Sequence, residues 1–288
     1  MLSLDHVSKT YRVGSFGRGR LIAVRDVTFD VKPGEVISLI GESGSGKSTI
    51  GRMILRLTPP TAGSISHDES DIAGFHGRAL KEYYRRVQGV FQDPFSSYNP
   101  IFKADRVFGM IHAEFFPHVG GDEWRERVND ALEAVSLNTG DALHKYPHQL
   151  SGGQLQRLLV ARALLLEIEY LVADEIISML DASTRIDVLN LLADLKERGL
   201  GILFITHDLS LGNYISDSTV ILRRGSIVEM GETAKVFGDP RHPYTRMLLA
   251  SVPQLHTKWK PGAQRQALPE YTEAPPLVEV ESGHLAAL

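Results

Sequence analysis

One stretch of the sequence decides the fold: residues 41–48 read Gly41-Glu42-Ser43-Gly44-Ser45-Gly46-Lys47-Ser48. The stretch matches the pattern G-x-x-x-x-G-K-[ST]. It lies between an apolar run, Val36 to Ile40, and a helical pattern, Thr49 to Leu57. The glycines allow the backbone to curl so that successive N–H groups point at phosphate oxygens, and the helix adds the positive end of its dipole. The stretch therefore predicts a nucleotide phosphate site.

Two side chains of this loop have predicted roles in the chemistry. Lys47 is expected to neutralise the β- and γ-phosphates, and the Ser48 hydroxyl is expected to ligate Mg²⁺. The predicted nucleotide contacts are Gly41, Ser43, Gly44, Ser45, Gly46, Lys47, Ser48 and Thr49. A chance glycine-rich turn is the alternative, but it does not explain the strand and helix on either side.

Other apolar runs and helical patterns predict the sheet around the loop. Three short runs resemble Val36 to Ile40, which is apolar almost throughout, as expected for a strand covered on both faces. They are Val87 to Phe91, Tyr170 to Ala173 and Ile202 to Ile205. Amphipathic helical patterns lie between them, which predicts a parallel α/β sheet. Residues 26–31 instead alternate polar and apolar, which predicts an antiparallel N-terminal sheet with one face in water.

The predicted domain organisation has three parts. Residues 1–235 are expected to form one α/β domain. Within it, residues from about 99 to 166 form an inserted helical subdomain, because that segment contains no convincing strand. Residues 236–258 are predicted to be a helical extension. Residues 259–288 are rich in proline and glutamate and poor in large apolar side chains, which predicts a flexible tail.

Composition excludes several classes of protein. The 288-residue chain has a formal net charge of −4, which argues against non-specific nucleic-acid binding. It contains no cysteine, so disulfides and cysteine-ligated metal or iron–sulfur sites are excluded. The N-terminus lacks a secretory signal, and no apolar run approaches the roughly 20 residues that span a bilayer. Any membrane part is therefore expected to come from another chain.

A pair of carboxylates follows the apolar run Tyr170 to Ala173. Asp174 and Glu175 are expected at the carboxyl end of a parallel strand, where α/β proteins bind their ligands. Asp174 is predicted to hold Mg²⁺, and Glu175 is predicted to orient and polarise the attacking water. The alternative is a solvated Asp-Glu turn.

A second anion cradle is predicted at Leu150-Ser151-Gly152-Gly153-Gln154, which precedes a helical run, Leu155 to Leu166. This stretch resembles the signature sequence of ABC ATPases. In that family the loop closes on the γ-phosphate held by the phosphate loop of a head-to-tail partner. The resemblance implies a P-loop NTPase fold of the ABC type, with a RecA-like parallel core. It also implies nucleotide contacts from Ser151, Gly152, Gly153 and Gln154. A merely capped helix start is the alternative.

Further positions match the family in order. Tyr11 resembles the aromatic that stacks on adenine, although core packing is the alternative for an isolated tyrosine. Gln92 resembles the Q-loop glutamine, which contacts the metal site and couples to the membrane subunit. Asp181 ends a stretch, residues 178–181, that resembles the D-loop. His207 resembles the switch histidine that contacts the γ-phosphate. The resemblance thus makes Glu175, His207 and Gln92 the predicted catalytic residues.

The resemblance has one departure. Members of the family commonly carry proline after the catalytic glutamate and alanine inside the D-loop, where this chain has Ile176 and Met179. Proline would fix φ and remove an N–H, and isoleucine does neither. The geometry of the D-loop and the rate of hydrolysis therefore do not follow from the resemblance.

Three segments resemble the oligopeptide and dipeptide importers within the family: residues 91–100, 146–149 and 241–249. This resemblance implies ATP and Mg²⁺ as cofactors and a peripheral location at the cytoplasmic face of the membrane. The implied partners are integral-membrane permease subunits, a second ABC ATPase that is a paralogue or a second copy, and, indirectly, an extracytoplasmic solute-binding protein. The group also includes carriers of short oligosaccharides and nickel, so the solute does not follow.

Two other functions would also account for a phosphate loop. A soluble ABC ATPase that acts on ribosomes or DNA usually carries two phosphate-loop halves or a long coiled coil, and this chain has one phosphate loop and a short helical insert. A nucleotide kinase or a simple P-loop switch does not account for the Ser-Gly-Gly-Gln loop.

Overall fold

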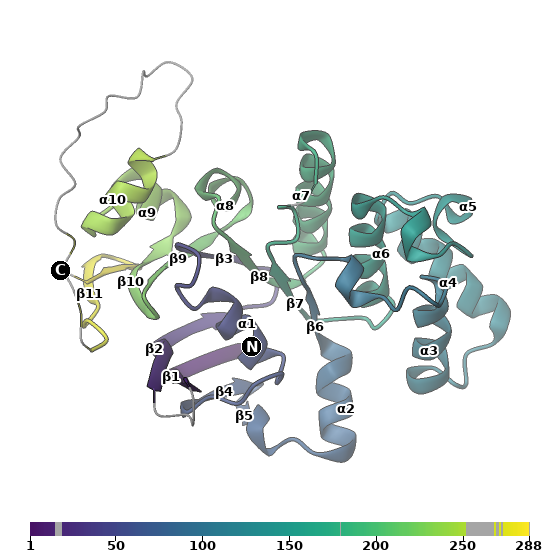
Figure 1. Ribbon diagram of the computed structural model, residues 1–288, viewed down its shortest axis with the longest axis horizontal. Coiled ribbons are helices and arrows are strands. Elements are labelled where there is room, and N and C mark those ends of the chain that lie inside the picture. Colours follow the sequence, from purple (N-terminus) through teal and green to yellow (C-terminus); the bar gives the residue numbers. More distant parts are fainter. Residues whose placement is uncertain (15–18, 179, 252–267, 269–270, 272, 288) are drawn as a thin grey trace. The chain divides into compact units, whose positions relative to one another are not determined.

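The protein is described by a computed structural model that covers residues 1–14, 19–178, 180–251, 268, 271 and 273–287. The chain divides into two compact units. Unit 1 comprises Met1–Gly74 and Leu203–Leu288, and unit 2 comprises Phe75–Ile202. Figure 1 shows the helices and strands of each unit.

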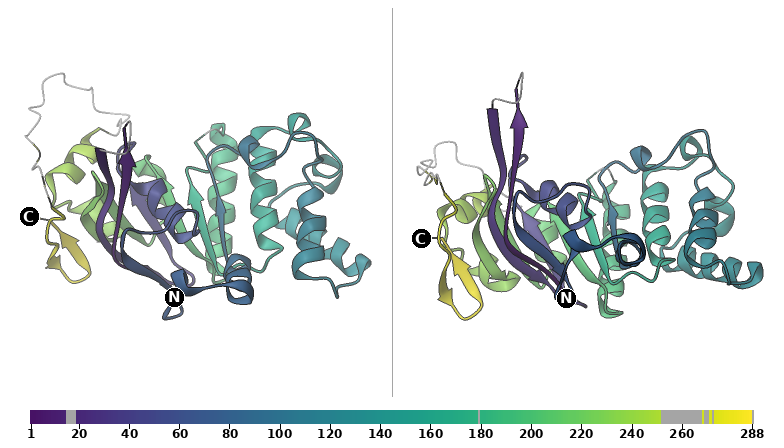
Figure 2. Two further views of the ribbon diagram at one scale, coloured as in Figure 1. Left: turned by 60° about the horizontal axis from the view of Figure 1, so that its bottom comes forward. Right: turned by 90° about the horizontal axis from the view of Figure 1, so that it is seen from below.

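Unit 1 begins with an antiparallel sheet whose strand order is β2-β1-β4-β5. Its strands are β1 Leu2–Val13, β2 Gly19–Val31, β4 Ala62–His67 and β5 Ser70–Asp71. Val27, Phe29 and Val31 are buried while the residues between them are exposed, so the predicted period-two pattern and the antiparallel N-terminal sheet are confirmed. Figure 2 shows the long hairpin of β1 and β2 extending from this sheet.

A second set of strands, all in unit 1 except the first two residues of β8, supports the phosphate loop. Its order is β11-β12-β10-β9-β3-β8. The strands are β3 Val36–Ile40, β8 Gly201–Thr206, β9 Ser218–Arg223, β10 Ser226–Glu232, β11 Val278–Glu281 and β12 His284–Ala286. All five residues of β3 are buried, and β3 pairs in parallel with β9, as expected for a strand covered on both faces. The helices of this unit are α1 Lys47–Ile54, α8 Leu209–Ile215, α9 Thr233–Gly238 and α10 Pro243–Ala250.

Unit 2 combines two parallel strands with helices. Strands β6 Val87–Val90 and β7 Tyr170–Asp174 pair in parallel. The helices are α2 Gly77–Arg86, α3 Arg106–Phe115, α4 Gly121–Ala134, α5 Thr139–Ala142, α6 Gly152–Leu164 and α7 Ala182–Glu197. Between residues 99 and 166 every assigned element is helical. The predicted strands at 36–40, 87–91, 170–173 and 202–205 are thus confirmed within a residue at each end.

The prediction of a flexible tail was wrong for residues 273–287. This segment forms a hairpin of β11 and β12, and β12 pairs antiparallel with β10. His284 and Ala286 are fully buried, so the few apolar and aromatic side chains of this acidic segment suffice to join an existing sheet edge. Composition alone did not predict this hairpin, because a strand that adds to an existing sheet needs no core of its own. The rest of the predicted tail is outside the described residues, apart from residues 268 and 271.

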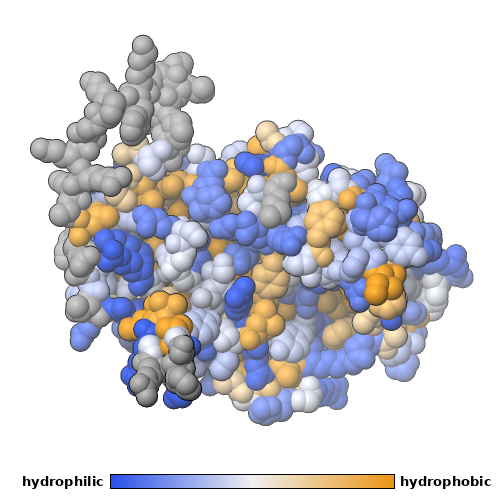
Figure 3. Space-filling view, in the orientation of Figure 1, coloured by the Kyte–Doolittle hydropathy of each residue, from blue (hydrophilic) through white to orange (hydrophobic). Residues whose placement is uncertain are grey.

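No membrane-spanning helix is found among the described residues. None of the helices described here combines the length and the apolarity that crossing a bilayer requires. On the face seen in Figure 3, the hydrophobic side chains form small groups separated by hydrophilic ones.

Candidate nucleotide-binding site

The phosphate loop joins β3 to α1 in unit 1, and its glycines are required by geometry. Gly46 precedes α1 with φ of 108°, in the left-handed region. A Cβ at Gly46 would lie 2.2 Å from the Ala23 carbonyl oxygen, and one at Gly41 would lie 2.1 Å from that of Leu222. The backbone therefore packs against its neighbours at distances that only glycine permits.

Lys47 lies across this loop. Its side chain is buried, and Nζ donates to the carbonyl oxygens of Gly41 at 2.7 Å and Glu42 at 2.9 Å. Within the described residues no side chain caps α1, and its first turn contains no acidic residue. The buried Ser45 hydroxyl also lacks a protein hydrogen-bond partner in that part of the chain. A helix start without a side-chain cap, a buried ammonium and an unsatisfied hydroxyl fit a phosphate anion.

His207 and Tyr11 are the other predicted nucleotide residues of unit 1. His207 is exposed and follows β8 directly, and β8 neighbours β3 in the sheet. Tyr11 is half-buried on β1, and Lys9 Nζ lies 5.1 Å from the centroid of its ring. The Tyr11 ring is thus partly accessible, and its stacking on adenine stays a prediction.

The predicted acid pair ends β7 in unit 2. All five residues of β7 are buried, and Asp174 is 7% exposed. Glu175 is half-buried and has φ of 51°, an uncommon left-handed conformation for a residue other than glycine. Its carbonyl oxygen accepts hydrogen bonds from the N–H and the hydroxyl of Ser178, which hold the turn. The chain thus reverses sharply at the position predicted to carry the catalytic carboxylate.

Gln92 is exposed and follows β6, the parallel neighbour of β7. Since parallel neighbours end at the same edge of a sheet, Gln92 and Asp174 share one edge of unit 2. Gln156 on α6 donates to the Phe91 carbonyl oxygen at 3.4 Å, which ties this loop to the helix that follows the signature sequence.

The signature loop forms a capped helix start in unit 2. Ser151 Oγ accepts from the Gln154 N–H at 3.2 Å, and Gln154 Oε1 accepts from the Ser151 N–H at 2.9 Å. A Cβ at Gly153 would lie 2.9 Å from Thr184 Cγ2, so glycine allows α6 to approach α7 closely. The capped helix start that was the alternative for this stretch is therefore present, and the role of the loop in anion binding stays a prediction.

Asp181 caps α7. Its carboxylate accepts from the Thr184 N–H at 3.0 Å and from the hydroxyls of Ser183 and Thr184. These hydrogen bonds hold the pKa of Asp181 well below its usual range, and the one from Ser183 contributes most. Met179, the other residue singled out in the D-loop, is outside the described residues.

The predicted Mg²⁺ ligands are Ser48 in unit 1 and Gln92 and Asp174 in unit 2. They offer a hydroxyl, an amide oxygen and a carboxylate, which are the hard oxygen donors that Mg²⁺ prefers. The donor set therefore fits the metal.

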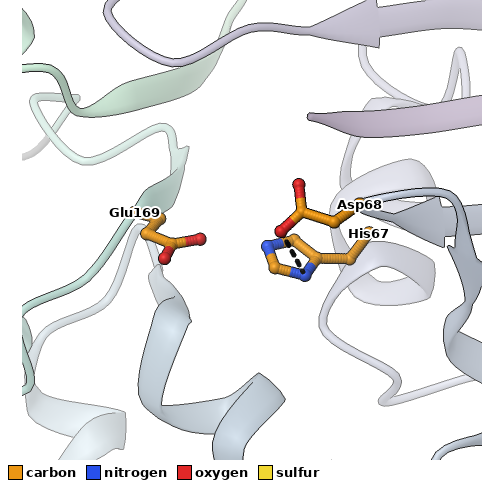
Figure 4. Close-up of side chains that lie close together, drawn as sticks. All are labelled: His67, Asp68 and Glu169. Carbon is orange, nitrogen blue, oxygen red and sulfur yellow. Dashed lines mark ion pairs between the residues drawn. The ribbon is translucent and has the colours of Figure 1, made fainter.

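His67 and Asp68, at the turn between β4 and β5, are another pair with metal-ligating side chains (Figure 4). His67 Nδ1 lies 3.7 Å from Asp68 Oδ2, and the N-terminal ammonium donates to Asp68 Oδ1 at 2.5 Å. This pair ties the start of β1 to the β4–β5 turn within unit 1.

One polar contact of the phosphate loop was not predicted from the sequence. The Glu42 N–H donates to the hydroxyl of Tyr244, on α10, at 3.1 Å. The stretch that contains Tyr244 stood out in the sequence only as a resemblance to the oligopeptide and dipeptide importers. A contact across 202 residues has no local signal.

Comparison with known proteins agrees with this arrangement. Residues 24–178 match the family model described as ABC transporter, and residues 228–276 match that of the oligopeptide/dipeptide transporter C-terminal region. A putative peptide import ATP-binding protein of Brucella ovis is 43% identical over 255 residues, covering 88% of this chain and 78% of that protein. The oligopeptide transport ATP-binding protein OppF of Streptococcus pyogenes serotype M1 is 42% identical over 243 residues, covering 83% and 79%.

Among solved structures, the ATP-binding cassette MJ0796, a dimer in a post-hydrolysis state with ADP and Pi, superposes with a TM-score of 0.72. It is 30% identical, and the match covers 81% of this chain and 99% of the cassette. The fold and the phosphate loop define a P-loop ATPase, and the chain belongs to the ABC transporter family. It binds ATP with Mg²⁺ and hydrolyses it.

Proposed function

We propose that this chain supplies the ATP hydrolysis that drives an importer of oligopeptides or dipeptides. The observation that carries the proposal is the C-terminal match: residues 228–276 resemble a region described for oligopeptide and dipeptide transporters, and they include α9 and α10. Relatives at 42–43% identity are named for peptide import and oligopeptide transport. No match among these supports a role on ribosomes or DNA.

Each residue of the site has a proposed role in the binding or hydrolysis of ATP. The loop from Gly41 to Thr49 binds the phosphates through its N–H groups, and Lys47 balances their charge. Ser48, Asp174 and Gln92 would hold Mg²⁺, which would supply neutralisation of the phosphate charge. Glu175 orients and polarises the attacking water.

His207 contacts the γ-phosphate and Tyr11 stacks on adenine. These roles rest on the family resemblance, on the position of His207 directly after β8 and on the partial exposure of Tyr11 on β1.

The signature loop is proposed to act on the ATP of a partner subunit. Ser151 to Gln154 form a separate helix start in unit 2, while the phosphate loop belongs to unit 1. A head-to-tail pair of ABC ATPases gives each loop its counterpart, with Asp181 near the dimer interface. The partner ATPase is a paralogue or a second copy.

Unit 2 offers a surface for membrane permease subunits around the Q-loop. Large apolar side chains are exposed in and after this loop: Phe95, Ile101, Phe102 and Met110. Exposed apolar side chains concentrated in one segment make that segment a candidate for a protein interface. We propose that permease loops dock here and hold the chain at the cytoplasmic face of the membrane, while a solute-binding protein acts from the other side.

Purification of the native complex tests the proposal. A tagged full-length chain, extracted in mild detergent, should retain permease subunits and a second ATPase, which mass spectrometry identifies. In proteoliposomes, a mixture of short peptides and the solute-binding protein should stimulate ATP hydrolysis. Recovery of ribosomes without permeases would contradict the proposal. Stimulation by nickel or oligosaccharides and not by peptides would redirect it to another solute.

A further inference from the structure

The C-terminal part of unit 1 reaches the phosphate loop through one hydroxyl. Tyr244 lies in the first turn of α10 and is fully buried in a cluster with Ile40 and Leu209. Its hydroxyl accepts the Glu42 N–H at 3.1 Å. Glu42 itself is exposed, so the buried ring brings a polar group to the rim of the loop.

This hydrogen bond holds one end of a single peptide group. The N–H of Glu42 and the carbonyl of Gly41 belong to the same planar unit, and Lys47 Nζ donates to that carbonyl at 2.7 Å. An ammonium that turns toward a phosphate releases the carbonyl, whereas the bond to Tyr244 does not involve the phosphate. Tyr244 is thus the contact that keeps this peptide in place while Lys47 engages the nucleotide.

The position of Tyr244 is itself fixed by buried polar groups. His242, two residues earlier, accepts the Tyr244 N–H at Nδ1, so in the neutral ring Nε2 carries the proton and faces the Tyr271 hydroxyl at 3.1 Å. Glu229 on β10 accepts the N–H groups of Arg241 and His242 at 2.6 and 3.0 Å.

The last hairpin completes this anchor. His284 Nε2 lies 2.8 Å from Glu229 Oε1, and both side chains are fully buried. The guanidinium of Arg223 lies 5.5 Å from the centroid of the Tyr244 ring, within range of a cation–π contact. The start of α10 is therefore set by β9, β10 and β12 together.

We propose that Tyr244 is a positioning residue for ATP binding: its hydroxyl fixes the Gly41–Glu42 peptide, and the buried Glu229–His242–His284 group holds Tyr244 in place. The C-terminal segment thereby supports the nucleotide site from within the same chain. This inference rests on ATP binding by the phosphate loop and is independent of the solute carried.

The variant Tyr244→Phe tests the proposal because it keeps the ring and removes only the hydroxyl. We expect the Kd for ADP to rise about fivefold, the factor that corresponds to one neutral hydrogen bond. The KM for ATP should rise by a similar factor with kcat nearly unchanged, since the contact acts on binding. Amide hydrogen exchange at Glu42 should become faster in the full-length protein.

Two further variants serve as controls. Tyr214→Phe removes a hydroxyl from an exposed tyrosine of α8 and should leave the Kd for ADP at the wild-type value. Tyr271→Phe removes the partner of His242 and should have an effect between those of the other two. Wild-type ADP affinity and wild-type exchange at Glu42 in Tyr244→Phe would overturn the proposal, as would an equal loss of affinity in Tyr214→Phe.

Discussion

Helices α1 and α6, whose starts are both proposed to bind the phosphates of ATP, differ in how their first turns are capped. At α1 the preceding residue is Gly46, which has no side chain to offer, and Lys47 covers the loop instead. At α6 the preceding residue is Ser151, which forms a reciprocal capping box with Gln154. The first start has no side-chain cap among the described residues and has a buried cation, and the second has already paired two of its donors within its own turn.

This difference gives the two loops different proposed tasks. A helix start without a side-chain cap, next to a buried ammonium, suits the tight binding of a phosphate in the isolated subunit. A capped start is stable without an anion, and it adds donors only when a partner brings a phosphate to it. The phosphate loop is therefore expected to determine affinity, and the signature loop is expected to determine hydrolysis in the dimer.

The largest expected effect comes from Lys47→Ala. The change removes the buried counter-charge of the phosphates, and we expect ATP hydrolysis to fall roughly 10²- to 10³-fold, as for loss of a donor that stabilises developing charge. Steady-state ATPase activity at saturating ATP measures this. Lys81→Ala, which removes a half-exposed lysine paired with Glu114, is the control and should retain wild-type activity. Wild-type turnover in Lys47→Ala would refute the assignment of the loop.

Glu175→Gln tests whether the two loops close on one nucleotide. The change keeps the size of the side chain and removes the base, so kcat should fall by about 10²-fold or more while ATP affinity is kept. ATP should then trap a dimer that size-exclusion chromatography detects. Glu197→Gln, on an exposed position of α7, is the control. A variant that turns over normally, or that stays monomeric with ATP, would show that Glu175 or the dimer is wrongly assigned.

Local patterns in the sequence predicted most of the fold, and they supplied the residues of the candidate site, whose roles stay predictions. Residues 41–48 and 150–154 each combine their chemistry with their own strand or helix, so short stretches sufficed. Local patterns did not predict two tertiary contacts. The contact of Tyr244 with Glu42 and the pairing of His284 with Glu229 join segments far apart in the chain. Such pairs depend on tertiary packing, which periodicity and composition do not describe.

Ser151→Ala should have a smaller effect than the changes at Lys47 and Glu175. It removes the cap of α6, which costs about 1 kcal/mol of helix stability, and it removes the hydroxyl proposed to face a partner's phosphate. We expect hydrolysis in the dimer to fall about tenfold, or 1.4 kcal/mol of barrier, with ATP affinity of the subunit unchanged. Ser151→Thr keeps the hydroxyl and should restore most of the activity. If Ser151→Ala also weakened ATP binding by the subunit, the proposed difference in task between the phosphate loop and the signature loop would be contradicted.

The smallest expected effect is a dependence of the free energy of unfolding on pH, which arises from His242 in unit 1. Burial, which is the largest cause, lowers the pKa of His242 to about 4; Glu229 opposes this shift, and Arg223 and Arg246 add to it. His242 is therefore neutral in the folded chain at pH 7, as its acceptance of the Tyr244 N–H requires. In the unfolded chain the ordinary pKa of a histidine is about 6.5.

Below pH 6.5 the unfolded chain binds a proton at this residue and the folded chain does not, so the free energy of unfolding decreases as the pH falls from 6.5 toward 4. Between pH 7 and pH 6 the expected decrease is about 0.5 to 1 kcal/mol, measured by denaturant unfolding at each pH. His242→Asn keeps a helix-capping acceptor and cannot titrate, so the same pH change should cost it less than the wild type. Equal losses in both proteins would mean that His242 is not the titrating group. In that case the support of the phosphate loop by α10 would be insensitive to pH, and the two helix starts would differ only in how they are capped.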